Sequence, residues 1–287
     1  MKKYFLAAIC LGLAGAVMAQ TPDSLLQQKE LDAWMAPVKY QFDSTQSAWS
    51  TYESHHFDSV TRQFDTTGLA VVQAFTSGLH KKEHAWLEEF VKAHPSYMAS
   101  IGALRRTLVP VVDDIDVTKK LYDRLDSAVR SSAAGRSLGE SIAARLAVAV
   151  GRIAPDFSGP DTAGNMVHLS SLRGKYVLLD FWASWCGPCR QENPTVVAAY
   201  KKYHSRNFEV LSVSLDQPGK RAEWIKAIQH DGMPWQHVSD LLFWKSPIAK
   251  LYAIQSIPQN FLIDPGGKIV AENLRGEELS RALGKLL

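Results

Sequence analysis

Two cysteines separated by two residues are the part of this chain best suited to chemistry. Cys186 and Cys189 lie in the motif Trp-Cys-Gly-Pro-Cys at 185–189, and the third cysteine, Cys10, lies near the start of the chain. A thiolate attacks a disulfide sulfur, and a second thiol one helical turn away can then displace the captured partner. The spacing therefore predicts a redox pair that alternates between a dithiol and a Cys186–Cys189 disulfide.

The segments on either side of the motif indicate how the cysteines are positioned. An apolar run at 176–183 precedes them, and a helix is predicted at 187–204. The N-terminus of a helix presents unpaired amide groups and a partial positive charge, and both favour an anionic cysteine. Pro188 suits the first helical turn, where a missing N–H costs little. We therefore expect Cys186 to be the nucleophile, with a lowered pKa, and Cys189 to be the resolving thiol.

A zinc site is the main alternative for such a pair, because two closely spaced cysteines form half of many zinc sites. A structural zinc needs four ligands, and the sequence contains no second cysteine pair. His168, His204 and His237 are scattered, without the spacing of paired ligands. Residues 80–84 match the H-x-x-E-H pattern of some zinc peptidases, but no distal ligand is identifiable. The sequence therefore predicts neither a metal nor a cofactor.

The region around the motif alternates between short apolar runs and helical patterns. Strands are predicted at 176–183, 208–215, 261–263 and 269–270, and helices at 187–204, 219–231, 246–253 and 277–287. The turn Asp-Pro-Gly-Gly at 264–267 joins the last two strands into a hairpin. This alternation predicts an α/β domain over 151–287, in which helices flank a mixed central sheet.

Residues 20–150 show a different pattern, typical of helices. Apolar residues recur at spacings of three and four at 85–98, at 117–129 and from Ile142 to Val150. We therefore expect a mostly α-helical N-terminal domain over 20–150, whose apolar stripes form its core. An exposed partner surface is the alternative for its aromatic residues Phe42, Trp49, Tyr52 and Phe57.

The first 19 residues have the pattern of a cleaved secretory signal. Lys2 and Lys3 precede an apolar run that ends at Val17-Met18-Ala19, with small residues at the two positions that a signal peptidase reads. The run is shorter than the roughly 20 residues that a membrane-spanning helix needs, so we expect no stable span after cleavage. The whole chain has a net charge of +3, with 46% hydrophobic and 21% charged residues. This balance indicates a globular protein and no nucleic-acid partner.

The segment at 180–189 resembles the active-site segment of thioredoxins. The stretches 153–157, 169–175 and 189–194 resemble, more narrowly, the exported TlpA/ResA-like branch. The resemblance covers 151–287 and implies a thioredoxin-like fold and a periplasmic thiol-disulfide oxidoreductase. It also implies protein disulfides as substrates, a role in cytochrome maturation or disulfide repair, and a membrane thiol transporter of the DsbD/CcdA type as electron donor. Residues 20–150 are similar to the segment that precedes this domain in some Bacteroidetes-type relatives.

The resemblance assigns further residues to the site. Pro258 matches the cis-proline that faces the cysteines, and the backbone of Ile257 would pair with an extended substrate. Asp180 and Glu192 match acids that can exchange a proton with Cys189, and their titrations would be coupled if both are buried. The groove beside the disulfide would be completed by Trp185, Gly187 and Pro188.

Two other functions remain open from the sequence. Residues 154–157 also resemble the start of peroxiredoxins, which favours a thiol peroxidase as an alternative. The helical region makes a binding module, with a secondary redox pair, the other alternative. For Trp224, Trp235 and Trp244, core or lid packing is the expected role and substrate contact the alternative.

Overall fold

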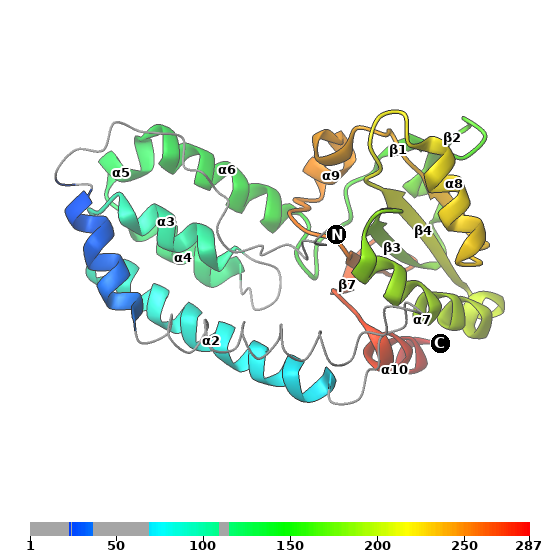
Figure 1. The fold of residues 1–287 in the computed structure, drawn as a ribbon, viewed down its shortest axis with the longest axis horizontal. Coiled ribbons are helices and arrows are strands. Elements are labelled where there is room, and N and C mark those ends of the chain that lie inside the picture. The colour runs from blue at the N-terminus through cyan, green and yellow to red at the C-terminus, as the bar shows by residue number, and fades with distance from the viewer. Residues whose placement is uncertain (1–22, 24, 37–68, 109–114) are drawn as a thin grey trace, which may run out of the picture. The chain divides into compact units, whose positions relative to one another are not determined.

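The structure is a computed structural model that describes residues 23, 25–36, 69–108 and 115–287, without the side chains of 69–77, 79 and 80. The predicted signal at 1–19 and the aromatic residues Phe42, Trp49, Tyr52 and Phe57 lie outside these residues. The chain divides into two compact units, Met1–Thr107 with Lys120–Gly135, and Leu108–Lys119 with Arg136–Leu287 (Figure 1). None of the helices in the described ranges is long and apolar enough to cross a membrane.

The first unit is helical, as predicted. It contains a helix at 25–36, α2 (Leu69–Ala93), α3 (Ala99–Thr107), the end of α4 (Ile115–Arg124) and α5 (Ser127–Ser131). Helix α2 ends just before His94-Pro95, because the residue before a proline disfavours helical geometry. The expected apolar stripes are buried at Leu87, Phe90, Leu121 and Leu125.

Helix α6 (Ala133–Ala147) begins in the first unit and belongs mostly to the second. Ile142 is buried, as its stripe predicts, but Val150 is 52% exposed. The prediction fails at Val150 because the helix has already ended at Ala147, ahead of Gly151 with its φ of +91°. Near the end of α6, Arg145 forms an ion pair of 2.7 Å with Glu272 in the second unit.

The second unit contains a mixed five-stranded sheet in the order β5-β4-β3-β6-β7. Its strands are β3 (Tyr176–Trp182), β4 (Phe208–Ser214), β5 (Gln236–Val238), β6 (Gln259–Ile263) and β7 (Ile269–Glu272). Strands β3, β4 and β5 are parallel, whereas β6 and β7 are antiparallel to their neighbours. Helices α7 (Gly187–Tyr203), α8 (Arg221–His230), α9 (Pro247–Leu251) and α10 (Gly276–Leu286) complete the unit. The predicted thioredoxin-like α/β fold is confirmed.

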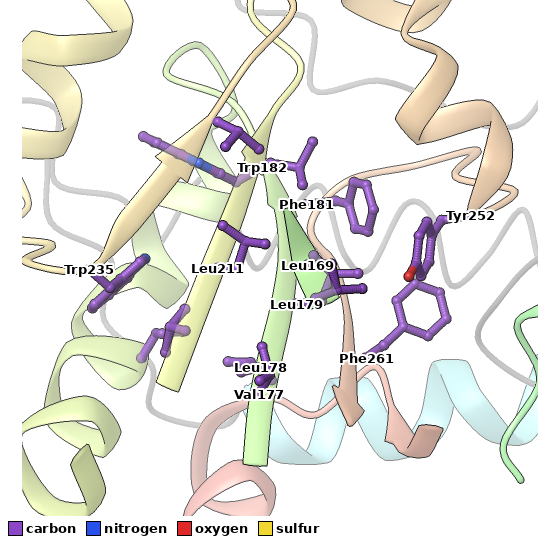
Figure 2. Close-up of a cluster of buried hydrophobic side chains, with 14 of the residues drawn as sticks. Leu169, Val177, Leu178, Leu179, Phe181, Trp182, Leu211, Trp235, Tyr252 and Phe261 are labelled. Atoms are coloured by element: carbon purple, nitrogen blue, oxygen red, sulfur yellow. The ribbon is translucent and has the colours of Figure 1, made fainter. Parts of the chain in front are cut away.

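The side chains of the central strand β3 alternate between the two faces of the sheet, and other parts of the domain pack against both faces. On one face, Phe181 packs against Phe261 and against Tyr252, which follows α9 (Figure 2). On the other face, the ring of Trp182 lies 5.9 Å from that of His237. Asp180 shares the face of Trp182 and is therefore a carboxyl group within a strand of otherwise apolar side chains.

Both edges of the sheet are covered by the first residues of the domain. Main-chain bonds of 2.7 and 2.8 Å join Gly151 and Arg152 to Ile269 of β7. The same stretch then forms a hairpin of β1 (Ser158–Pro160) and β2 (Met166–His168), and Pro160 accepts a bond from Ser239 just after β5. Strands of three residues are too short for their periodicity to be read, and neither this hairpin nor β5 was predicted.

Candidate active site

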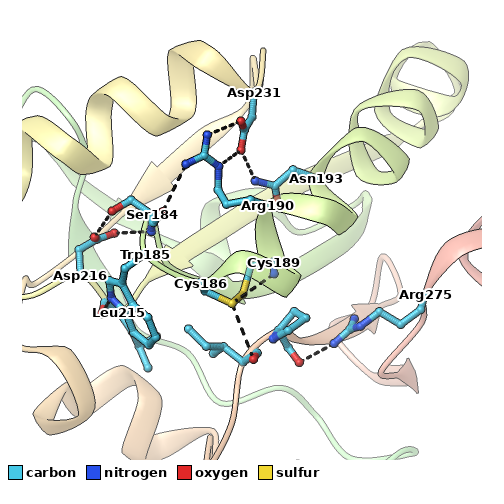
Figure 3. Close-up of a disulfide and its surroundings, with 12 residues drawn as sticks. Ser184, Trp185, Cys186, Cys189, Arg190, Asn193, Leu215, Asp216, Asp231 and Arg275 are labelled. Carbon is cyan, nitrogen blue, oxygen red and sulfur yellow. Dashed lines mark hydrogen bonds and ion pairs between the residues drawn. A yellow bond between two sulfur atoms is a disulfide. The ribbon is translucent and has the colours of Figure 1, made fainter. Parts of the chain in front are cut away.

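The two cysteines are joined by a disulfide at the start of α7 (Figure 3). Cys186 is the N-cap of this helix, and its Sγ accepts a hydrogen bond of 3.2 Å from the backbone N–H of Cys189. Gly187 and Pro188 occupy the first turn and are exposed, whereas Cys186 is 5% and Cys189 is 1% exposed. Strand β3 and α7 therefore hold the pair where helix-terminal amides reach Cys186 and Cys189 lies inside the domain.

The loop before the disulfide is held by a fully buried carboxylate. Asp216, which follows β4, accepts hydrogen bonds from the backbone N–H and the hydroxyl of Ser184, at 3.0 and 2.5 Å. The hydroxyl of Ser214 donates to the same carboxylate. Trp185 is 46% exposed, and its indole N–H donates to the carbonyl of Leu215. These contacts fix the orientation of Trp185 next to Cys186, and no sequence pattern predicted the role of Asp216 in them.

A second brace connects the first turns of α7 to the end of α8. Arg190 donates two hydrogen bonds to Asp231 and a third to the carbonyl of Ser184. Asn193, whose packing the sequence left open, is buried and donates to Asp231 at 2.7 Å. Although burial raises the pKa of Asp231, its bonds to Arg190, His230 and Asn193 lower it below the usual range. This brace holds the helix that carries the cysteines.

The Ile257–Pro258 segment lies next to the disulfide. The peptide bond between these residues is cis, and the carbonyl oxygen of Ile257 lies 3.8 Å from Cys186 Sγ. The carbonyl of Pro258 accepts a hydrogen bond of 2.5 Å from Arg275 (Figure 3). Both predicted residues are thus at the site, and their part in binding substrate stays a prediction.

Asp180 is a buried acid on the face of β3 that α7 covers. It is 6% exposed, and it accepts a hydrogen bond of 3.3 Å from Ser212, whose hydroxyl in turn accepts from the indole of Trp235. Burial raises the pKa of Asp180 to about 6, against the opposing effects of Arg275 and Ser212. A carboxyl group with such a pKa can accept and release a proton near neutral pH.

Glu192, one turn after Cys189, forms the second acid of the site. Its carboxylate accepts a hydrogen bond of 2.8 Å from the backbone N–H of Gly276. Burial raises the pKa of Glu192, whereas the Gly276 bond and Arg275 oppose that shift. The charge of Glu192 also raises the pKa of Asp180, so the protonation of one acid affects that of the other.

Arg275 is a further residue of the site that the sequence did not predict. Its half-buried guanidinium interacts electrostatically with both Asp180 and Glu192, and burial lowers its own pKa. Asn260, opposite Asp180 in β6, exchanges two hydrogen bonds with the backbone of Leu274 and thereby fixes the segment that leads to Arg275. An isolated arginine more than 80 residues away from the cysteines gives no local signal of this position.

The structure also bears on the possible metal site and on the roles of the three tryptophans. Among the residues that the structure describes, no group of three or more His, Cys, Asp or Glu side chains could hold a metal ion. Glu83, within the H-x-x-E-H pattern, accepts hydrogen bonds from Arg106. Trp224 and Trp235 are buried in the core, whereas Trp244 is 40% exposed and lies beside Trp185.

Comparisons with known proteins agree with this geometry. The model described as the AhpC/TSA family matches residues 150–272. The thiol-disulfide oxidoreductase ResA of Geobacillus thermodenitrificans is 35% identical over 125 residues, which are 44% of this chain and 69% of that protein. ResA of Bacillus subtilis is 32% identical over 130 residues, 45% of this chain and 69% of that protein. A solved thiol-disulfide oxidoreductase from Bacteroides fragilis is 40% identical, covers 47% of this chain and 100% of its own, and has a TM-score of 0.45.

The ResA matches extend over more than two thirds of each relative. Identities above 30% over that share are enough to assign a family, and the thioredoxin-like sheet with its cysteine pair agrees with the assignment. The chain is an enzyme that belongs to the family of ResA-like thiol-disulfide oxidoreductases.

Proposed function

We propose that Cys186 and Cys189 cycle between dithiol and disulfide and thereby reduce disulfide bonds in other proteins. The observation that supports this most directly is the asymmetry of the pair. Cys186 caps the helix and accepts an amide hydrogen bond, whereas Cys189 is 1% exposed and precedes Glu192 by one helical turn. One sulfur is thus placed to attack a client, and the other is placed to release it.

The cycle balances in two steps. The Cys186 thiolate attacks one sulfur of the client disulfide, and the other client sulfur leaves as a thiolate that takes up a proton. Cys189 then passes its proton to Asp180, or to Glu192 coupled with it, and attacks the Cys186 sulfur of the mixed disulfide, so that the second client sulfur leaves as a thiolate and takes up a proton. The client leaves with both thiols reduced, and the enzyme retains the Cys186–Cys189 disulfide. Two electrons have moved from the enzyme to the client.

The direction of the reaction and its compartment are part of the proposal. The Gly-Pro spacer is that of thioredoxin, whose potential is about −270 mV, so we expect a reducing protein with a potential below about −200 mV. We propose that residues 1–19 export the chain to the periplasm. A membrane thiol transporter of the DsbD/CcdA type would then supply the electrons, and cytochrome maturation or disulfide repair would use them.

The domain organisation belongs to the same proposal. We assign the redox chemistry to residues 151–287 and a separate helical domain to 20–150. Deletion of residues 20–132 should leave the reduction of a small disulfide in place. Loss of that activity in a folded deletion variant would contradict the division.

Trapping tests the proposed cycle directly. Cys189→Ser should accumulate mixed disulfides on Cys186 when it is mixed with oxidised insulin, because the resolving thiol is missing. Cys186→Ser, the matched control, should trap none and should leave insulin unreduced. Equal trapping by the two variants, or insulin that the wild-type dithiol leaves intact, would reject the mechanism. Peroxide consumption that survives Cys189→Ala would instead favour the thiol peroxidase.

A further inference from the structure

An exposed group of apolar side chains lies beside the disulfide. Trp185, Leu242, Phe243 and Trp244 form this group, called here the aromatic surface. The ring of Trp185 lies 5.4 Å from that of Phe243 and 6.5 Å from that of Trp244. Leu242 and Trp244 are 44% and 40% exposed, so the rings pack on one another without entering the core.

The backbone under the aromatic surface is strained. Leu241 and Phe243 have φ angles of +54° and +57°, a region that large side chains rarely adopt. Such conformations are unfavourable for residues other than glycine, and they persist where the surroundings hold them in place. The strained residues lie on either side of exposed Leu242. Leu241 packs against the hydrophobic core, while the strained stretch leaves Leu242 and Trp244 exposed, which points to a role of these two side chains in binding.

Hydrogen bonds hold this loop in a fixed shape. The carbonyl of Asp216 accepts a bond of 3.2 Å from the N–H of Phe243, while the carboxylate of the same residue holds Ser184. Asp240 accepts from the N–H of Leu242 at 2.9 Å and from the hydroxyl of Ser246 at 2.6 Å. One buried residue, Asp216, thus holds both the loop that carries Trp185 and the loop that carries Phe243. Aromatic rings that are already fixed before a client binds lose little conformational entropy on binding.

We propose that the aromatic surface docks client segments that carry a bulky apolar side chain next to the disulfide to be reduced. This inference rests on the proposed reduction of protein disulfides and names the client class. The surface is continuous with the redox site, because Trp185 directly precedes Cys186. Cys186 itself is 5% exposed, so a client must lie against the neighbouring surface to bring its sulfur within reach.

The chemistry of the aromatic surface indicates which kind of client binds there. Exposed tryptophan and leucine side chains gain binding energy by removing apolar area from water, and tryptophan is a common centre of binding energy at interfaces. A small polar disulfide covers little of this area, whereas a peptide with leucine or phenylalanine beside its cysteine covers more. The surface should therefore change the KM for such peptides more than the kcat.

Three substrates and four proteins test the proposal. The substrates are a disulfide peptide with Leu and Phe beside the cysteine, the same peptide with Ser and Gln there, and hydroxyethyl disulfide. Trp244→Ala should lower kcat/KM about tenfold for the apolar peptide, mainly through KM, and less than twofold for the other two. Trp244→Phe should restore most of the loss. Leu286→Ala, the control, removes another 40% exposed side chain near the end of α10 and should change nothing.

The outcomes separate this proposal from the function on which it rests. Equal losses on all three substrates, or no loss on the apolar peptide, would overturn the docking role while leaving disulfide reduction established. A second copy of this chain is the competing occupant, and a dimer that Trp244→Ala dissociates in sedimentation would likewise overturn the proposal. A wild-type protein that reduces none of the substrates would instead reject the proposed function.

Discussion

The two sides of the disulfide differ in kind. On the buried side, Asp180, Ser212, Glu192 and Arg275 form a set of charged and polar groups with restricted access to solvent. On the other side, the aromatic surface presents apolar rings to water. Buried charges strengthen electrostatic effects, and exposed rings provide contact area. The difference suggests that the buried side controls how fast a client is released and the aromatic surface controls which client binds.

The largest expected effect is a slower resolution of the mixed disulfide when an acid of the buried side is replaced. Asp180→Asn removes the proton acceptor with the smallest change in shape, so resolution of the mixed disulfide should slow about 100-fold at pH 7. Glu192→Gln should slow it less, because Glu192 is less buried than Asp180. Rapid-quench analysis with alkylation of the mixed disulfide measures this step. Client capture by Cys186 should be unchanged, and a variant that slows capture and release equally would break the comparison.

A second expected effect concerns the stability cost of the buried side. The pKa of Asp180 is about 6 in the folded protein and near 3.8 when the chain is unfolded. Between these values the folded protein binds more protons, so this group lowers stability as pH rises through that range. Asp180→Asn should therefore raise the free energy of unfolding by about 2–3 kcal/mol at pH 8 and by almost nothing at pH 4.

Denaturant unfolding of the disulfide form at both pH values measures this gain. Ser212→Ala, which keeps the acid and removes a partner of its charged form, should instead lower the stability at pH 8. If Asp180→Asn raised the free energy of unfolding equally at pH 4 and pH 8, the gain would not come from removing a buried carboxylate, and the prediction would be wrong.

A third expected effect concerns Arg275, whose charge lowers the pKa of both acids. Arg275→Met should raise both pKa values, so the pH at which resolution becomes half-maximal should move upward from near 6. The rate should fall several-fold at pH 6.5 and stay nearly unchanged at pH 9. Arg275→Lys keeps the charge and should keep most of the wild-type profile, although it loses the bond to Pro258. A uniform loss at every pH would indicate a structural role alone.

The smallest expected effect tests the brace of the aromatic surface. Ser184→Ala removes the hydroxyl that donates to Asp216 and leaves the backbone bond in place. We expect a two- to threefold loss of preference for the apolar peptide over the polar peptide, with resolution rates unchanged. Paired competition between the two peptides measures this ratio. A change in the resolution rate would show that the two sides are not independent.

The sequence predicted the parts of this site that lie close together along the chain. The apolar run of β3, the cysteines and the start of α7 form one local pattern, so their order and chemistry were readable. Pro258 and Glu192 were found through family resemblance. Arg275 could not be found in this way, because its contacts with Asp180 and Pro258 depend on how β6 and β7 align in the sheet. The helical stripe that ended at Val150 failed for a related reason, since periodicity does not mark where a helix stops.

The covered edges of the sheet restrict how this enzyme can meet other chains. Unpaired edge strands invite pairing with foreign strands, which leads to aggregation or to binding by strand addition. Here residues 151–160 bond to β7 at one edge and lie beside β5 at the other. Under the proposed function, the enzyme would meet many such strands in its clients. Residues 151–160 would shield the sheet from them and leave the disulfide loop as the place where a client can engage.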